Sequence, residues 1–244
     1  LAIGHMFSGI NALVSAHALY DFNKLPYVDY DKPWWSQYLR DTLEVDDVLL
    51  LHNSDLVYKF NDCIFFNKKI YNKKIYEDYN FEYDLYKLVK DGKWTWDKLI
   101  SMAKQVSVDV NNDGVYDEED LYGYYITSNS WLDTNWVYAN GLTIASIENG
   151  RISVDNAKSE KMKSVVDMMY SLIKQGNQTL ISQNKADIQD IKPFINGRTL
   201  FMENITLVLP SMRDADVDFG ILPLPKYNEE QEHYYSMASP QMMM

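Results

Sequence analysis

The amino-acid sequence predicts an α/β fold with a mainly parallel sheet. Segments whose apolar residues have helical spacing alternate along the chain with short apolar runs that are typical of buried strands. With 46% hydrophobic residues, the 244-residue chain has enough apolar side chains to bury a sizeable core. No internal repeat or long linker divides it, so its length fits one large domain or two small ones.

The N-terminal quarter of the chain is expected to contain two helices and two strands. One helix is predicted over residues 12–19, after a loop or helix start near residues 5–9, and a second over residues 36–44. Continuous apolar runs at residues 48–51 and 63–66 indicate short buried strands.

Three further helices and two strands are expected after residue 84. Apolar residues share one helical face over residues 85–89 and again over residues 99–106, where Thr95 is the expected N-cap. A longer apolar stripe runs from residue 162 to residue 173. Glycines follow the first and third helices at positions suited to a left-handed cap. The two strands are expected at residues 198–202 and 217–222.

Composition and charge exclude several classes of function. The net charge of −12 argues against nucleic-acid binding, which needs a basic surface to neutralise phosphates. Mean hydropathy is −0.36, and no apolar run approaches the roughly 20 residues of a membrane helix. Cys63 is the single cysteine, so an internal disulfide is excluded and a small buried side chain is expected. Aromatic residues make up 14% of the chain and suit contact surfaces as well as cores.

Residues 109–120 have the spacing of a calcium-binding loop. Side-chain oxygens fall at positions 1, 3, 5, 9 and 12, and glycine falls at position 6, where the loop must turn sharply. The last ligand is an Asp, one methylene shorter than the usual Glu. We expect a structural Ca²⁺, and the alternative is an Asx-rich turn that caps a helix starting at Glu118. The candidate metal ligands are Asp109, Asn111, Asp113, Val115 (through its carbonyl), Asp117 and Asp120.

Catalytic motifs are not evident in the sequence. The four histidines, at positions 5, 17, 52 and 233, are scattered and include no H-E-x-x-H pair. The sequence contains no G-x-S-x-G motif, no phosphate-binding loop and no G-x-G-x-x-G motif. We therefore expect a protein that is not an enzyme.

Several stretches together resemble one family of binding proteins. The stretches are residues 32–35, 64–68, 85–123 and 197–235, which follow one another in the family's order over nearly the whole chain. They are similar to the extracellular solute-binding proteins of ABC sugar importers, the family 1 type that includes maltose-binding protein. Family members are longer at both ends, so we expect this sequence to be an internal segment of a longer protein.

The resemblance implies a periplasmic-binding-protein-like (Venus flytrap) fold with two α/β lobes joined by hinge strands, its N-lobe incomplete in this chain. Residues 1–57 and 223–244 would belong to the N-lobe, and residues 58–222 would form the C-lobe. The chain would cross between the lobes near residues 55–65 and return near residues 222–225. Ligand would bind between the lobes, and closure would follow because only the closed state contacts it from both sides.

The function implied is binding of a sugar or oligosaccharide for import by ABC permease subunits, without catalysis. The protein would be a monomer located outside the cell, either lipid-anchored at the cell surface or periplasmic, with its secretion signal outside this segment. One alternative is a non-catalytic or catalytic domain of a carbohydrate-active enzyme. Another is a sensor subunit of a two-component system built on the same fold.

The resemblance also places candidate ligand contacts. Trp131 falls on an expected loop where sugar-binding relatives place a stacking aromatic ring. Leu207 stands where maltose-binding protein has a stacking Trp, which argues against a maltodextrin-like mode of binding. Trp94 and Trp96 are expected to be structural, at the start of a helix. Asn129 and Asp133 would be hydrogen-bonding partners beside Trp131, and the remaining contacts would come from Phe7, Ser8, Asp55, Glu203 and Asn204.

Overall fold

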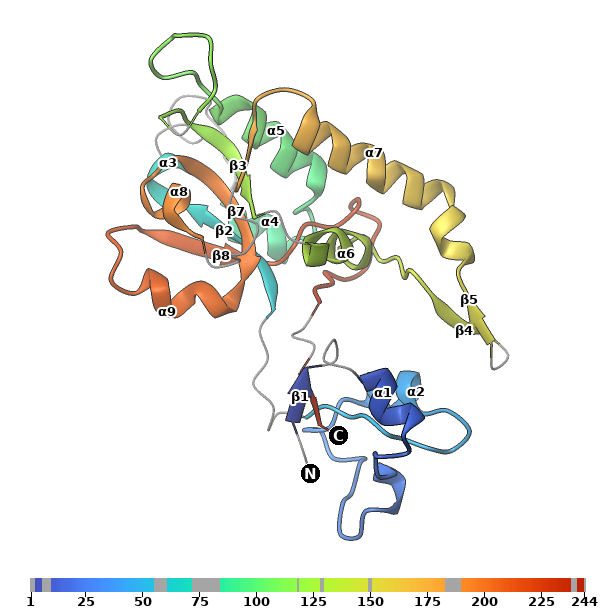
Figure 1. Ribbon diagram of the computed structural model, residues 1–244. Coiled ribbons are helices and arrows are strands. Elements are labelled where there is room, and N and C mark those ends of the chain that lie inside the picture. Colours follow the sequence, from blue (N-terminus) through green and yellow to red (C-terminus); the bar gives the residue numbers. More distant parts are fainter. Residues whose placement is uncertain are drawn as a thin grey trace. The chain divides into compact units, whose positions relative to one another are not determined.

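The computed structural model divides the chain into two compact units (Figure 1). The first consists of Leu1–Phe60 and Ala238–Met244, and the second of Asn61–Met237. Among the helices of the described residues, none has the length and apolar character needed to cross a bilayer. The structure describes residues 3–5, 10–54, 61–71, 84–117, 119–127, 130–148, 151–182, 190–237 and 241–243.

The first unit is small and mostly irregular. Strand β1 (Ile3–His5) pairs antiparallel with β9 (Gln241–Met243), so the two ends of the chain meet in one ladder. Helix α1 (Ile10–Ser15) is shorter than the predicted helix, whereas α2 (Gln37–Leu43) confirms the second prediction. A short 3₁₀ helix (η1) covers Phe22–Lys24.

The strand predicted at residues 48–51 is wrong. Leu49 is fully buried, but its main chain bonds to the start of η1 and not to a strand. Its N–H donates to the Asp21 carboxylate at 3.1 Å, and its carbonyl accepts from the Phe22 N–H at 2.7 Å. The apolar run supplies the small core of this unit, where Leu49 packs with Phe22 and Tyr30.

The second unit contains a five-stranded mixed sheet. Four of its described strands run in one direction, as predicted, but β2 runs opposite to its neighbours β7 and β8. The sheet is therefore mixed, with β2 as its one antiparallel strand among the described residues. In order across the sheet, the strands are β6 (Thr179–Ile181), β3 (Tyr122–Ile126), β7 (Thr199–Ile205), β2 (Asp62–Asn67) and β8 (Phe219–Leu222).

Helices cover both faces of this sheet (Figure 1). Alternate residues of β2 serve two cores: Ile64 and Phe66 lie in the larger one, and Cys63 and Phe65 in the smaller one. The larger core contains residues of α4 (Leu85–Lys90), α5 (Trp96–Val106), α6 (Ser130–Ala139) and α7 (Glu160–Lys174). The smaller core contains residues of α8 (Lys192–Ile195) and α9 (Leu209–Met212). The remaining elements are α3 (Lys68–Ile70), the β4–β5 hairpin (Ser146–Glu148, Arg151–Ser153), η3 (Asp155–Lys158) and η4 (Thr206–Val208).

The helices with clear apolar stripes are confirmed. α4, α5 and α7 form where predicted, and Gly92 and Gly176 follow α4 and α7 with φ of +70° and +93°. Thr95 occupies the N-cap position of α5, although its side chain makes no capping hydrogen bond. The strands predicted at 63–66, 198–202 and 217–222 correspond to β2, β7 and β8.

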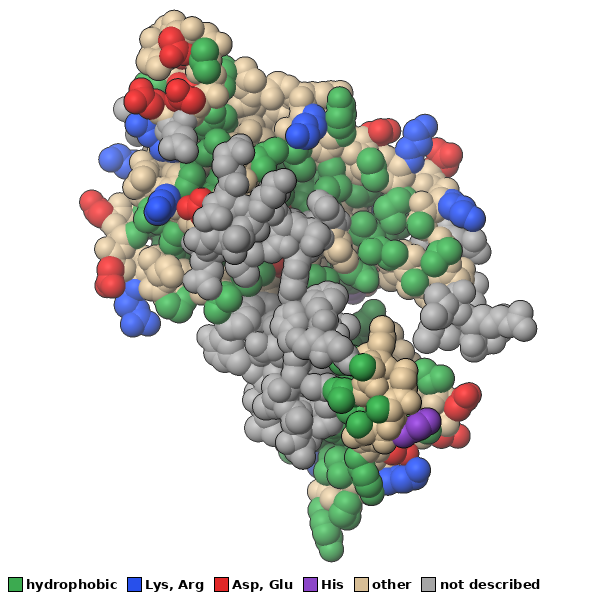
Figure 2. Space-filling model, in the orientation of Figure 1, with side chains coloured by type: hydrophobic (Ala, Val, Ile, Leu, Met, Phe, Trp, Pro, Cys, Tyr) green, Lys and Arg blue, Asp and Glu red, His purple; other side chains and the backbone are tan. Residues whose placement is uncertain are grey.

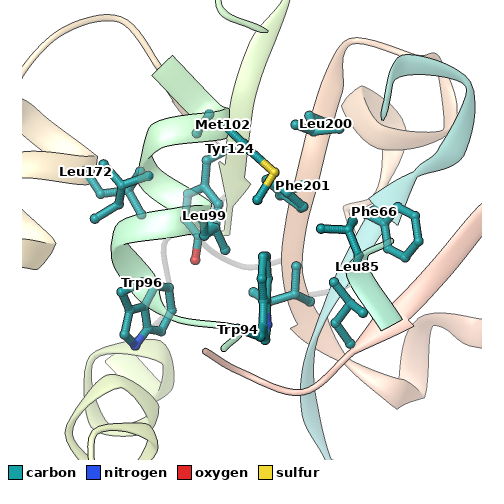
Figure 3. Close-up of a cluster of buried hydrophobic side chains, with 14 of the residues drawn as sticks. Phe66, Leu85, Trp94, Trp96, Leu99, Met102, Tyr124, Leu172, Leu200 and Phe201 are labelled. Carbon is teal, nitrogen blue, oxygen red and sulfur yellow. The ribbon is translucent and has the colours of Figure 1, made fainter. Parts of the chain in front are cut away.

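Strand β3 packs closely on α5 through a glycine. A side chain at Gly123 would place its Cβ 2.0 Å from the Ala103 carbonyl oxygen, so only glycine permits this approach. The Gly123 N–H donates to the Ser107 hydroxyl at 3.0 Å. The core beside this contact holds side chains from α5 and the sheet, among them Leu99 and Met102 (Figure 3).

Residues 223–237 lie in the second unit, whereas the sequence analysis assigned them to the first lobe. The N–H of Lys226 donates to the Trp94 carbonyl, and the N–H of Trp96 donates to the Lys226 carbonyl, each at 3.1 Å. The Trp94 indole N–H donates to the Pro223 carbonyl at 2.9 Å. These bonds hold the segment after β8 beside α5. The assignment of the lobes themselves stays a prediction.

Candidate functional site

The predicted ligand contacts fall in different parts of the structure. Phe7, Ser8, Asp55 and Asn129 lie outside the described residues. Trp131 and Asp133 lie in the first turns of α6, so the loop expected at Trp131 is replaced by a helix start; their side chains are outside the described part. Glu203 and Asn204 were expected just past a strand end, but they lie within β7. Their contact with a ligand stays a prediction.

Glu203 is fully buried at the centre of the sheet. In register it stands between Ile64 of β2 and Ile126 of β3, on the face covered by the larger core. Its Oε2 accepts a hydrogen bond from the indole Nε1 of Trp136 at 2.9 Å and another from the Tyr124 hydroxyl. Such donors offset the cost of removing a carboxyl group from water. Burial and the nearby Glu203 charge both raise the pKa of Tyr124.

Asn204 has a different environment from Glu203. Its side chain is buried, and its Oδ1 accepts from the N–H of Ile205 at 2.8 Å. Its carbonyl accepts a weak bond from the Sγ of Cys63 at 3.5 Å. Cys63 is buried, as predicted, and burial raises the pKa of its thiol, which makes it chemically unreactive.

Trp136 holds α6 against α5. Its ring stacks on Trp96 with centroids 3.7 Å apart and planes 22° apart. The C-terminal end of α6 is held by Gln231 as well, whose Nε2 donates to the Ala139 carbonyl at 2.9 Å. Trp94 and Trp96 are fully buried and lie at the start of α5, which confirms their structural role (Figure 3).

Asp62 is a second buried carboxyl group in this unit, at the start of β2. Burial raises the pKa of Asp62 to about 7, and the side chain of Asn135 in α6 opposes this shift. The N–H of Asp62 donates to the Met237 carbonyl at 3.3 Å, so the segments that enter and leave the unit are joined at this point.

Sequence reasoning missed Asp62, Tyr124 and Trp136. For Asp62, an acidic residue just before an apolar run is typical of a turn. For Tyr124, the residues of β3 do not alternate between apolar and polar, so the sequence marks neither face of the strand. The sequence around Trp136 carries no signal either, because Ser130–Ala139 has no clear apolar stripe.

The loop at residues 109–120 is closed by its own main chain. The Asp109 carboxylate accepts from the N–H groups of Asn112 (2.7 Å) and Gly114 (2.8 Å), and Gly114 has the expected positive φ of +81°. Asp120 is buried and accepts from Val110 (2.8 Å) and Asp117 (2.9 Å).

These contacts bear on the two interpretations of the loop. Residues 119–121 are not helical; a turn leads from them directly into β3. Among the described residues, no three His, Cys, Asp or Glu side chains are grouped so that they could hold a metal ion. Each carboxylate oxygen keeps a second lone pair that a hard cation could use. Calcium binding therefore stays a prediction.

An apolar groove of about 480 Å³ runs between α6 and α7. Two of its side chains, Val166 and Tyr170, are more than half exposed. Figure 2 shows apolar side chains gathered over the surface of α7. The groove is lined by Thr134, Val137, Ile144, Val165, Val166, Met169, Tyr170, Ile173 and Lys174.

Comparison with solved structures shows the fold. A family 1 extracellular solute-binding protein from Bifidobacterium longum subsp. infantis is 17% identical, with a TM-score of 0.58 over 98% of this chain and 56% of that one. Maltose-bound MalE3 of T. maritima is 16% identical, with a TM-score of 0.57 over 92% of this chain and 52% of that one. UspC of M. tuberculosis is 15% identical, with a TM-score of 0.60 over 93% and 55%.

The chain shares the fold of extracellular solute-binding proteins. No protein-family model and no curated protein matches it. The solute-binding-protein resemblance seen in the sequence is thus confirmed at the level of the fold. The chain spans about half the length of the solved structures it matches, so it corresponds to a part of the two-lobe fold.

The raised pKa of Asp62 predicts a dependence of stability on pH. The unfolded carboxyl group has a pKa near 3.9, and the folded group has one of about 7. Between these values the folded chain keeps a proton that the unfolded chain releases, so stability falls as pH rises through this window and levels off above it. Asp62→Asn should remove this loss and stabilise the protein at pH 8 by on the order of 2–4 kcal/mol.

Urea unfolding of wild type and Asp62→Asn from pH 4.5 to pH 8 measures this difference. Asp214→Asn, at an exposed carboxylate, serves as the matched control and should follow the wild type. A stability difference between Asp62→Asn and wild type that stays constant with pH would show that the carboxyl group titrates normally.

Proposed function

We propose that the protein is the substrate-binding component of an ABC importer, and that it binds a sugar or oligosaccharide. The observation that carries this proposal is the fold shared with extracellular solute-binding proteins, one of which was solved with maltose bound. The sequence resemblance to sugar-binding members supports the same ligand class. The protein would act outside the cell, lipid-anchored or periplasmic, as a monomer that delivers its ligand to permease subunits.

The proposed site would comprise the start of α6 and residues of the other lobe. Trp131 would pack its ring on the apolar C–H face of a sugar, and Asn129 and Asp133 would exchange hydrogen bonds with its hydroxyl groups. Phe7, Ser8 and Asp55 would add contacts from the other lobe. The ligand would contact both lobes only in the closed state. It would therefore bind the closed state more tightly than the open state, and this difference in affinity would favour closure.

The protein would bind its ligand without changing it. The sequence contains no recognisable motif that pairs a nucleophile with a general base. A glycosidase would also need two carboxyl groups about 5–9.5 Å apart across the scissile bond. The alternative, a domain of a carbohydrate-active enzyme, makes a different prediction about the fate of the ligand.

Incubation of the full chain with a panel of mono- and oligosaccharides separates the two functions. A binding protein should show a ligand-dependent rise in melting temperature, because ligand that binds only the folded state stabilises it. Chromatography of the same mixtures should show every glycan unchanged. Release of product would establish an enzyme, and a panel with no thermal shift would argue against a sugar as the ligand.

Trp131→Ala should weaken binding of the sugar found by this panel about 5- to 150-fold. This range follows from on the order of 1–3 kcal/mol for a stacked aromatic contact at 1.4 kcal/mol per tenfold. Stability should change little, whereas truncation of a core ring would cost about 3–5 kcal/mol.

Calorimetric titration beside a melting curve measures both effects. Tyr170→Ala removes an aromatic ring that is 57% exposed on α7 and is the matched control. Unchanged affinity together with a large fall in melting temperature would place Trp131 in the core instead of the site.

We also propose that the loop at residues 109–120 binds a structural Ca²⁺. Excess EDTA should then lower the melting temperature relative to millimolar calcium, because the ion stabilises only the folded state. Asp109→Asn, which removes a charge from the first ligand, should reduce this difference. Identical melting curves of the wild type in EDTA and in calcium would reject the ion.

A further inference from the structure

The position of Glu203 in the sheet is one that an apolar residue would normally fill. Its register partners are Ile64 and Ile126, and the same face of β7 carries the buried Phe201. Burying a carboxyl group here costs free energy of desolvation that an apolar side chain would avoid. A carboxyl group differs from an apolar side chain in that its hydrogen bonds are directional, so it fixes the orientation of the donor groups that bond to it.

One of these donors belongs to α6. The Trp136 indole is held in two ways at once: its face lies on Trp96 at a centroid distance of 3.7 Å, and its N–H points to Glu203 Oε2 at 2.9 Å. Stacked rings fix their separation but can slide over one another at little cost. The hydrogen bond removes this freedom. Together the two contacts fix both the distance of α6 from α5 and its position along the sheet.

We propose that Glu203 is a positioning residue of the sugar site, acting through Trp136 on the start of α6. This proposal rests on the proposed function. Trp131 lies five residues before Trp136 on the same helix, a rise of about 7.5 Å. A shift of the anchor therefore moves the turn that bears Trp131, and a binding site tolerates displacements of only about 0.5 Å. Glu203 need not touch the ligand for this role.

The two donors to Glu203 provide a matched pair of variants. Trp136→Phe removes a donor that belongs to α6, and Tyr124→Phe removes a donor that belongs to β3. Both leave the same carboxyl group with one donor fewer, but only the first releases the helix. Glu203→Leu removes the acceptor, and Glu203→Gln restores a carbonyl toward which both donors can point.

Hydrogen exchange of the main-chain amides and sugar affinity are measured on each variant of the full chain. Trp136→Phe and Glu203→Leu should raise exchange at residues 134–139 of α6 at least about tenfold, with α5 and α7 changed much less. They should weaken binding of the sugar identified by the glycan panel about 5- to 50-fold. Tyr124→Phe should stay within about threefold of the wild type in both measurements, and Glu203→Gln should keep the exchange of α6 within about threefold of the wild type.

Three results would overturn the proposal. Unchanged exchange in α6 would show that Glu203 does not anchor the helix, and faster exchange with unchanged affinity would show a structural role alone. A loss of affinity in Glu203→Gln with unchanged exchange would show that Glu203 contacts the ligand directly. If the wild type binds no sugar, the proposed function fails and the role in binding fails with it, while hydrogen exchange still decides whether Glu203 anchors α6.

Discussion

The second unit depends on the insertion of β2 between β7 and β8. Cys63 in β2 contacts Asn204 in β7 across 141 residues of sequence, so the sheet cannot close until most of the unit has been brought together. Alternate side chains of this one strand enter the cores on both faces, and all of them are buried. Pairing over such separations carries a large loop-closure entropy, which the two cores must offset.

Asp62 and Glu203, two of the buried carboxyl groups of this unit, meet the same physical problem in different ways. Asp62 has a pKa close to neutrality, so the group can shed its charge by binding a proton. Glu203 instead has two hydrogen-bond donors directed at one oxygen. Both face α6, the helix that carries the expected stacking ring.

Sequence patterns predicted the elements whose burial is local. The apolar stripe of α7 and the apolar run of β2 can be recognised in the sequence alone. In each case the residues that become buried form a single local pattern, one helical face or one continuous run. β3 and α6 escaped prediction because Tyr122–Ile126 and Ser130–Ala139 mix aromatic and polar residues, whose burial is set by distant partners such as Gly123 on Ala103 and Trp136 on Trp96. The run at 48–51 shows the converse, since Leu49 is a core residue whose main chain bonds to Asp21 and Phe22. For the site, the resemblance named Trp131, which lies at the start of α6 and whose contact with a ligand stays a prediction. No local pattern could show that Glu203 would be buried beneath this helix.

The hydrogen bond between Asp62 and Met237 has a topological consequence. It joins the first and last segments of the second unit, so the unit is an insertion whose two ends lie side by side. A domain with adjacent ends can be moved to another host chain or circularly permuted without stretching its connections. The first unit, whose β1–β9 ladder unites residues from both ends of the chain, is the natural host of this insertion. Evolution could therefore exchange the inserted unit as a module and leave the surrounding ladder unchanged.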